Sequence, residues 1–162
     1  MELQAFEAQV LTLAGALSRR GWRIATAESC TGGSIAAACT QLAGSSDWFE
    51  RGFVTYSNAA KSDLLGVDPA LIEAQGAVSE AVARAMVQGA LRRAPVDLAV
   101  AVTGIAGPGG AVPGKPVGTV WLAWGTAAGV QAERLQLGGD RDAVRSASVR
   151  TALQRLIEAA GA

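Results

Sequence analysis

The segment 25–33 (ATAESCTGG) combines nucleophilic side chains with a glycine turn. Ser29 offers a hydroxyl and Cys30 a thiol, and either group can attack a carbonyl carbon. Gly32 and Gly33 allow close backbone approach, and backbone amides at the start of a helix stabilise an anion or a developing oxyanion. The pattern therefore predicts a nucleophile beside an oxyanion site. The alternative is a plain strand-to-helix connection whose hydroxyl side chains only cap the helix.

A second cluster, 56–61, could supply the base. The chain contains no histidine, which excludes Ser-His-Asp and Cys-His catalysis and histidine metal sites. Lysine can act as the base when burial lowers its pKa, and the chain has only two lysines, Lys61 and Lys115. The single tyrosine, Tyr56, could donate or relay a proton. Lys61 is distant from the glycine turn in the chain, so only the fold could bring them together, and a solvated helix lysine is the alternative.

Two later glycine-rich segments could line a binding site. The stretch 104–118 holds most of the prolines and has neither helical nor strand periodicity, so it predicts a long surface loop that forms a lid or a substrate wall. Arg141 begins the last helix, where a cation opposes the helix dipole unless an anion compensates. A phosphate site is therefore one interpretation of Arg141, and pairing with Asp140, Asp142 or Glu133 is the other.

Helical and strand patterns alternate along the chain. Apolar residues spaced by three and four predict the first helix, and short apolar runs between turn residues predict strands. The expected helices are 3–19, 34–42, 58–65, 69–75, 79–93 and one from 140 to the end, and the expected strands are 22–27, 52–56, 97–103, 119–124 and 130–137. The last two strands form a hairpin. The pattern predicts one α/β domain over 1–162, with helices on both faces of a mixed sheet.

Composition narrows the class of partner. Fourteen basic residues balance fourteen acidic ones, so no overall basic field attracts nucleic acid or an anionic membrane, and a small-molecule partner is expected. Two cysteines, Cys30 and Cys39, are too few for a disulfide framework or a four-thiolate zinc site, which suits a reducing cytoplasm. No apolar run is long enough to span a membrane.

Together these segments resemble the CinA C-terminal domain family, the nicotinamide-nucleotide amidohydrolases. The matching stretches run in order over nearly the whole chain: TAESCTGG (26–33), GSSDWFERGFVTYSNAAK (44–61), GAVSE (76–80), TGIAGPGG (103–110), KPVGTV (115–120) and GDR (139–141). The resemblance implies a three-layer α/β/α sandwich with a mixed, mostly parallel sheet. It also implies hydrolysis of nicotinamide mononucleotide to nicotinate mononucleotide and ammonia without metal or cofactor, by a homodimer or larger homo-oligomer.

The resemblance also assigns roles to residues. Ser29 is the expected nucleophile, Lys61 the general base and Tyr56 a supporting proton donor. The residues themselves, rather than the resemblance, predict a substrate-binding set, which is Thr31, Gly32, Gly33, Thr103, Gly104 and Arg141. Two other functions stay open: a non-catalytic nucleotide- or protein-binding module linked to competence or DNA damage, and an amidohydrolase for another small amide.

Overall fold

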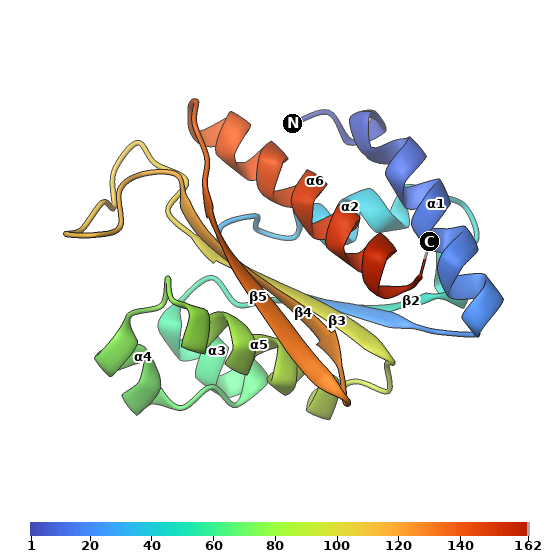
Figure 1. Ribbon diagram of the computed structural model, residues 1–162, viewed down its shortest axis with the longest axis horizontal. Coiled ribbons are helices and arrows are strands. Elements are labelled where there is room, and N and C mark those ends of the chain that lie inside the picture. Colours follow the sequence, from blue (N-terminus) through green and yellow to red (C-terminus); the bar gives the residue numbers. More distant parts are fainter. Residues whose placement is uncertain (162) are drawn as a thin grey trace.

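A computed structural model of the chain describes residues 1–161 and consists of one sheet between two layers of helices (Figure 1). The elements follow in this order: η1 Leu3–Phe6, α1 Glu7–Arg20, β1 Ile24–Glu28, α2 Ser34–Thr40, η2 Ser45–Asp47, β2 Phe49–Val54, α3 Asn58–Leu65, α4 Pro69–Gln75, α5 Glu80–Arg93, β3 Leu98–Gly104, β4 Thr119–Thr126, β5 Gly129–Gln136 and α6 Arg141–Ala159. None of the helices in this described part is both long and apolar enough to cross a lipid bilayer.

The sheet is mixed, as the sequence predicted. Its strand order is β2-β1-β3-β4-β5. The first three strands in that order are parallel, whereas β4 is antiparallel to β3 and β5 is antiparallel to β4. The carboxyl ends of β1, β2 and β3 therefore meet at one edge. Open α/β sheets bind their ligands at this edge.

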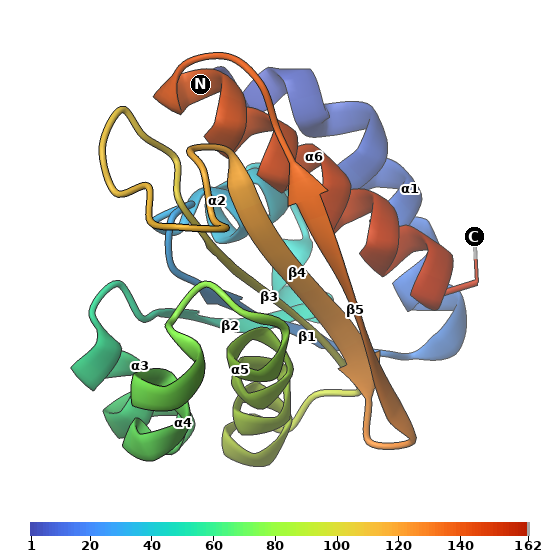
Figure 2. The same cartoon turned by 60° about the vertical axis from the view of Figure 1, so that its left-hand side comes forward.

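Side chains that alternate in size along the strands give the two faces different packing. Leu98, Val100 and Val102 of β3 join the core beneath α1, α2 and α6. Ala99 and Ala101 point to the other face, which packs against α3, α4 and α5 (Figure 2). Small side chains on this second face let α5 lie close to the sheet. The alternation follows from the two-residue period of a strand, and it produces the expected three layers.

Helix caps and turns agree with the sequence patterns in most places. The Ser79 Oγ accepts the Val82 amide at the start of α5, and the Asp140 Oδ1 accepts the Ala143 amide at the start of α6. The two short helices α3 and α4 have the predicted bounds. Residues 105–118 form a loop with only an isolated bridge, and this loop extends beyond the carboxyl edge of the sheet (Figure 1).

Several sequence-based bounds were wrong by one or two residues, as in β1, α2 and β4, and two elements differ in a more informative way. The first helix opens with a 3-10 turn, so that α1 itself begins at Glu7. Strand β2 runs over Phe49–Val54 rather than 52–56. It pairs with β1 on one side only, and its alternation of apolar and polar residues is weak. Pairing with β1, rather than a local pattern, therefore sets where β2 starts.

Candidate active site

The fold brings Ser29 and Lys61 into contact. Ser29 follows the last residue of β1, and Lys61 lies in α3, which begins just after the neighbouring strand β2. The Lys61 Nζ lies 3.2 Å from the Ser29 Oγ and 3.0 Å from the carbonyl oxygen of Thr55. The Thr55 amide donates to the Glu28 carbonyl at 2.8 Å and so continues the β1–β2 ladder past the end of β2. The parallel pairing thus holds the hydroxyl and the amine together.

Burial makes Lys61 suited to proton transfer. Its side chain is 1% exposed, and it forms no ion pair with any acidic residue that the structure describes. Desolvation lowers the pKa of the Lys61 amine below the ordinary lysine value, while buried Cys30 acts weakly in the opposite direction. A neutral amine beside a serine hydroxyl can accept its proton, which is how lysine replaces histidine in serine catalysis.

Cys30, the other candidate nucleophile, is in a poorer environment. Its side chain is 6% exposed, and burial raises the pKa of the Cys30 thiol to about 11. The thiolate is the reactive form of cysteine, and an apolar environment disfavours it. The hydroxyl of Ser29, which contacts the amine directly, is therefore the better placed nucleophile.

Glu28 anchors the nucleophile turn, and the sequence analysis gave it no role. Its carboxylate is fully buried at the end of β1. The Oε1 accepts from the Thr31 hydroxyl at 2.7 Å and the Ile35 amide at 2.9 Å, and the Oε2 accepts from the Thr26 hydroxyl at 3.3 Å and the Ala36 amide at 3.0 Å. Both amides, those of Ile35 and Ala36, belong to the first turn of α2. The carboxylate therefore occupies the N-terminus of α2, which leaves only the turn's own amides for an oxyanion.

The turn offers two such amides. The N–H groups of Thr31 and Gly33 donate to no protein acceptor among residues 1–161, whereas the Cys30 N–H contacts the sulfur of its own side chain. The Gly32 amide instead donates to the Ser29 carbonyl at 3.0 Å and closes the turn. Gly32 and Gly33 have φ values of +60° and +95°, a region in which other residues are strained. Of the three turn residues predicted to bind substrate, Thr31, Gly32 and Gly33, the first and the last therefore have amides available for an oxyanion.

Arg145 holds the same turn from α6, and the sequence analysis also missed it. Its Nε donates to the Cys30 carbonyl at 3.1 Å, and its Nη2 donates to the Thr31 carbonyl at 3.1 Å and to the Ser34 Oγ at 3.2 Å. In a planar trans peptide the C=O and the next N–H point in opposite directions. Arg145 therefore directs the Thr31 amide away from itself. The four-residue spacing from Arg141, which puts both on one helix face, was the only signal for it.

Arg141 contacts Tyr56 rather than an acidic side chain. Its Nη2 donates to the Tyr56 hydroxyl at 3.0 Å, and its Nη1 donates to the Gly107 carbonyl at 2.9 Å. The predicted alternative of pairing with a neighbouring acid is wrong. Within residues 1–161 Asp142 pairs with the N-terminal amine, Glu133 pairs with another arginine, and Asp140 caps α6 without forming an ion pair. Arg141 is exposed and keeps an uncompensated charge. Tyr56 is 60% exposed, and no hydrogen bond joins it to either Ser29 or Lys61 in the described chain.

Thr103 and Gly104 lie at the carboxyl end of β3, where both already contact other parts of the protein. The buried Thr103 hydroxyl donates to the Ala77 carbonyl at 2.9 Å. A Cβ on Gly104 would lie 2.7 Å from the Val120 Cγ2, so glycine here permits close packing of β3 against β4. Both residues therefore shape the edge of the sheet beside Ser29.

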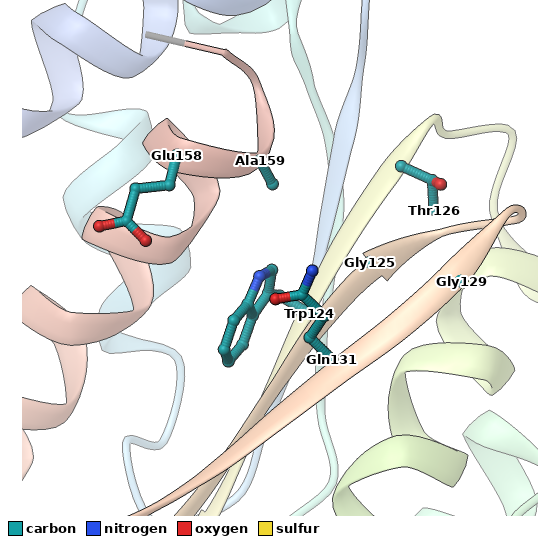
Figure 3. A pocket seen from close by; sticks show the side chains of 7 residues that line it. All are labelled: Trp124, Gly125, Thr126, Gly129, Gln131, Glu158 and Ala159. Atoms are coloured by element: carbon teal, nitrogen blue, oxygen red, sulfur yellow. The ribbon is translucent and has the colours of Figure 1, made fainter.

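A pocket of about 290 Å³ lies at the opposite edge of the sheet, where the β4–β5 hairpin meets the end of α6 (Figure 3). Trp124, Gln131 and Glu158 line it, and it includes none of the residues predicted to act in catalysis. The chemistry of this chain therefore concentrates at the carboxyl edge, around Ser29.

Fold and site together define the class: a three-layer α/β/α protein in which a serine and a buried lysine meet at the carboxyl edge of the parallel strands. The chain belongs to the CinA C-terminal domain family, whose model matches residues 7–160. This confirms the resemblance seen in the sequence.

Curated relatives and a solved structure agree with this membership. A Pseudomonas putida protein named nicotinamide-nucleotide amidohydrolase PncC is 54% identical over 142 residues, covering 88% of this chain and 89% of that protein. An Enterobacter agglomerans protein of the same name is 52% identical over 151 residues, covering 90% and 92%. The crystal structure of the competence/damage inducible protein CihA from Agrobacterium tumefaciens superposes with a TM-score of 0.92 at 47% identity, covering 94% of each chain. With relatives this similar, the chain is an enzyme.

Proposed function

We propose that this protein hydrolyses the carboxamide of nicotinamide mononucleotide to give nicotinate mononucleotide and ammonia, with Ser29 as nucleophile and Lys61 as base. The observation that carries the proposal is the 3.2 Å contact between the Ser29 Oγ and the buried Lys61 Nζ. The names of the similar enzymes supply the substrate.

The first half of the proposed reaction forms an acyl-enzyme. The neutral Lys61 amine takes the Ser29 proton while the Ser29 Oγ attacks the carboxamide carbon. The carbonyl oxygen becomes an oxyanion, which the free amides of Thr31 and Gly33 stabilise. When the tetrahedral intermediate collapses, the C–N bond breaks and the Lys61 ammonium returns its proton to the leaving ammonia.

The second half releases the acid. Lys61 takes a proton from water, the hydroxide attacks the Ser29 ester, and the same amides stabilise the second oxyanion. Collapse breaks the ester bond and returns the proton to the Ser29 Oγ. Protons balance over the two halves, so one water is consumed and one ammonia is released.

The other predicted residues act at the rim of this site in the proposal. Arg141 is exposed and has no acidic partner within residues 1–161, so its guanidinium can pair with the substrate phosphate while it orients Tyr56 through their hydrogen bond. Tyr56 then supports proton transfer only when the substrate is bound. We further propose that the enzyme is a cytoplasmic homodimer or larger homo-oligomer that needs no cofactor and binds no nucleic acid.

The test is the release of ammonia from nicotinamide mononucleotide by purified, EDTA-treated protein. Free nicotinamide and nicotinamide riboside serve as comparison substrates. The proposal expects turnover of the mononucleotide, with nicotinate mononucleotide formed in equal amount. If well-folded protein turns over another small amide faster, the substrate assignment is wrong, and if it turns over none, the non-catalytic alternative replaces it.

A further inference from the structure

A second pocket lies near the same edge of the sheet, on the face that α5 covers. Its volume is about 530 Å³, within the range of small-molecule sites. Four parts of the chain meet there: the end of α4, the start of α5, the loop 105–118, and neighbouring positions of β4 and β5. The side chains that give it its chemistry are Glu80, Arg84, Lys115, Trp121 and Arg134.

The charges in this pocket do not balance. Arg84 pairs with Glu80, the only acidic residue among the described residues that line the pocket. The Lys115 Nζ donates to the Gln75 carbonyl at 2.9 Å, and the Arg134 Nη2 donates to the Gly114 carbonyl at 2.9 Å. Neutral carbonyl oxygens do not cancel a positive charge. Lys115 and Arg134 therefore give the pocket two cations that are free to bind an anion such as a phosphate.

An aromatic ring lines the same pocket as these cations. Trp121 is partly buried, and it pairs with Thr103 on one side and Arg134 on the other. Directly paired residues in adjacent antiparallel strands have side chains on the same face. The three side chains thus form a row across the sheet, with Trp121 in the middle. A partly exposed indole beside two cations suits a ligand that carries both a planar ring and a phosphate.

The protein separates this pocket from the nucleophile. The hydrogen bond from the Thr103 hydroxyl to the Ala77 carbonyl lays the segment that precedes α5 over the end of β3. Ser29 follows strand β1, which pairs with β3 on the side away from β4 and the pocket. Ser29 does not line the pocket. The pocket and the Ser29 site are therefore neighbours divided by Thr103 and Ala77.

We propose that this pocket binds a nucleoside monophosphate, with the base against Trp121 and the phosphate held by Lys115 and Arg134. The inference goes beyond the proposed deamidation, because it concerns residues outside the Ser29 site. The Lys115 Nζ already contacts Gln75 at the end of α4. A bound nucleotide would further stabilise this contact between α4 and the loop 105–118, to which Lys115 belongs.

The test is titration calorimetry with adenosine 5′-monophosphate on the full chain. We expect saturable binding, at least tenfold weaker binding of adenosine and of inorganic phosphate, and at least a tenfold loss in the Lys115→Gln/Arg134→Gln variant. Trp121→Leu should weaken binding of the nucleotide without changing that of inorganic phosphate. An Arg19→Gln/Arg92→Gln variant removes the same charge elsewhere and should bind as the wild type does.

Ser29→Ala separates this inference from the proposed function, because it should bind the nucleotide normally. If nicotinamide mononucleotide competes with adenosine 5′-monophosphate in that variant, the natural ligand of the pocket is the substrate nucleotide. If the two bind together, the natural ligand of the pocket is a nucleotide other than the substrate. Either result supports the pocket when Lys115→Gln/Arg134→Gln loses the binding of adenosine 5′-monophosphate. Competition that persists in that double variant places both nucleotides at the Ser29 site and overturns the inference. Absence of saturable binding to active wild-type protein would overturn the inference and leave the deamidation proposal intact. Equal losses in the two double variants would also overturn it.

Discussion

Glu28→Gln tests the anchoring of the nucleophile turn with almost no change in shape. The wild-type carboxylate is fully buried and accepts four hydrogen bonds, two on each oxygen. A glutamine keeps one accepting oxygen and replaces the other with an NH₂ group, which only donates. A threonine hydroxyl can reverse its role and accept from that group. The backbone amide on the same side, from Ile35 or Ala36, cannot.

The amide of Ile35, which is buried, or of Ala36, which is partly buried, therefore loses its acceptor, depending on how the glutamine amide is oriented. A hydrogen bond to a charged group contributes about 1.5–3 kcal/mol, and a buried donor left without a partner costs about 1–3 kcal/mol. Because these two figures overlap in what they count, we expect Glu28→Gln to lower the free energy of unfolding by about 2–4 kcal/mol. The same change should lower kcat more than it raises KM, since the turn presents the oxyanion donors.

Urea denaturation at neutral pH measures the predicted loss of stability. Glu158→Gln is the matched control, because the Glu158 side chain is 46% exposed and its ion pair lies at the surface. We expect the control to cost less than about 1 kcal/mol. If Glu28→Gln costs no more than the control, the carboxylate does not anchor the turn, and the reasoning from its four hydrogen bonds is refuted.

Three further predictions concern proton transfer, substrate charge and packing. Lys61→Arg should reduce kcat at least about 100-fold, because a guanidinium does not lose its proton. The wild-type rate should rise with pH through an apparent pKa below the ordinary lysine value, since burial lowers the Lys61 pKa. A pH–rate profile of the wild type and the variant measures the rate loss and the apparent pKa. Arg141→Ala should raise KM for nicotinamide mononucleotide and spare nicotinamide riboside, and steady-state kinetics with equal losses on both substrates would contradict phosphate binding. Gly89→Ala should destabilise the fold by at least about 1–3 kcal/mol, because its Cβ would lie 2.1 Å from the Leu65 carbonyl oxygen, and a thermal melt measures this.

The sequence predicted the elements well wherever local patterns decide them. The predicted helix starts at 79 and 140 and the bounds of α3 and α4 follow from short-range side-chain chemistry, and the structure confirms them, with Ser79 and Asp140 as the caps. Strand β2 was less predictable, because its start depends on pairing with β1. The alanines of β3 look unremarkable in the sequence, yet they determine how closely α5 packs.

Part of the site could be anticipated, and part depends on tertiary contacts. The scarcity of lysine and the absence of histidine singled out Lys61, and the fold places it against Ser29. Glu28 and Arg145 escaped notice because half or more of their hydrogen bonds go to backbone groups, and no residue-type pattern reveals a backbone partner. Thr103 shows the reverse case, since a neighbouring carbonyl already occupies the hydroxyl expected to line the pocket.

The central claim is that Ser29, activated by Lys61, is the nucleophile of an amide hydrolysis. The most direct measurement compares ammonia release from nicotinamide mononucleotide by Ser29→Ala and by its neighbour variant Cys30→Ala, with folding of both checked by circular dichroism. We predict no detectable turnover for Ser29→Ala and near-wild-type turnover for Cys30→Ala, whose buried thiol has a raised pKa of about 11 in the wild-type protein. Retained turnover in Ser29→Ala, or its loss only in Cys30→Ala, would contradict the account.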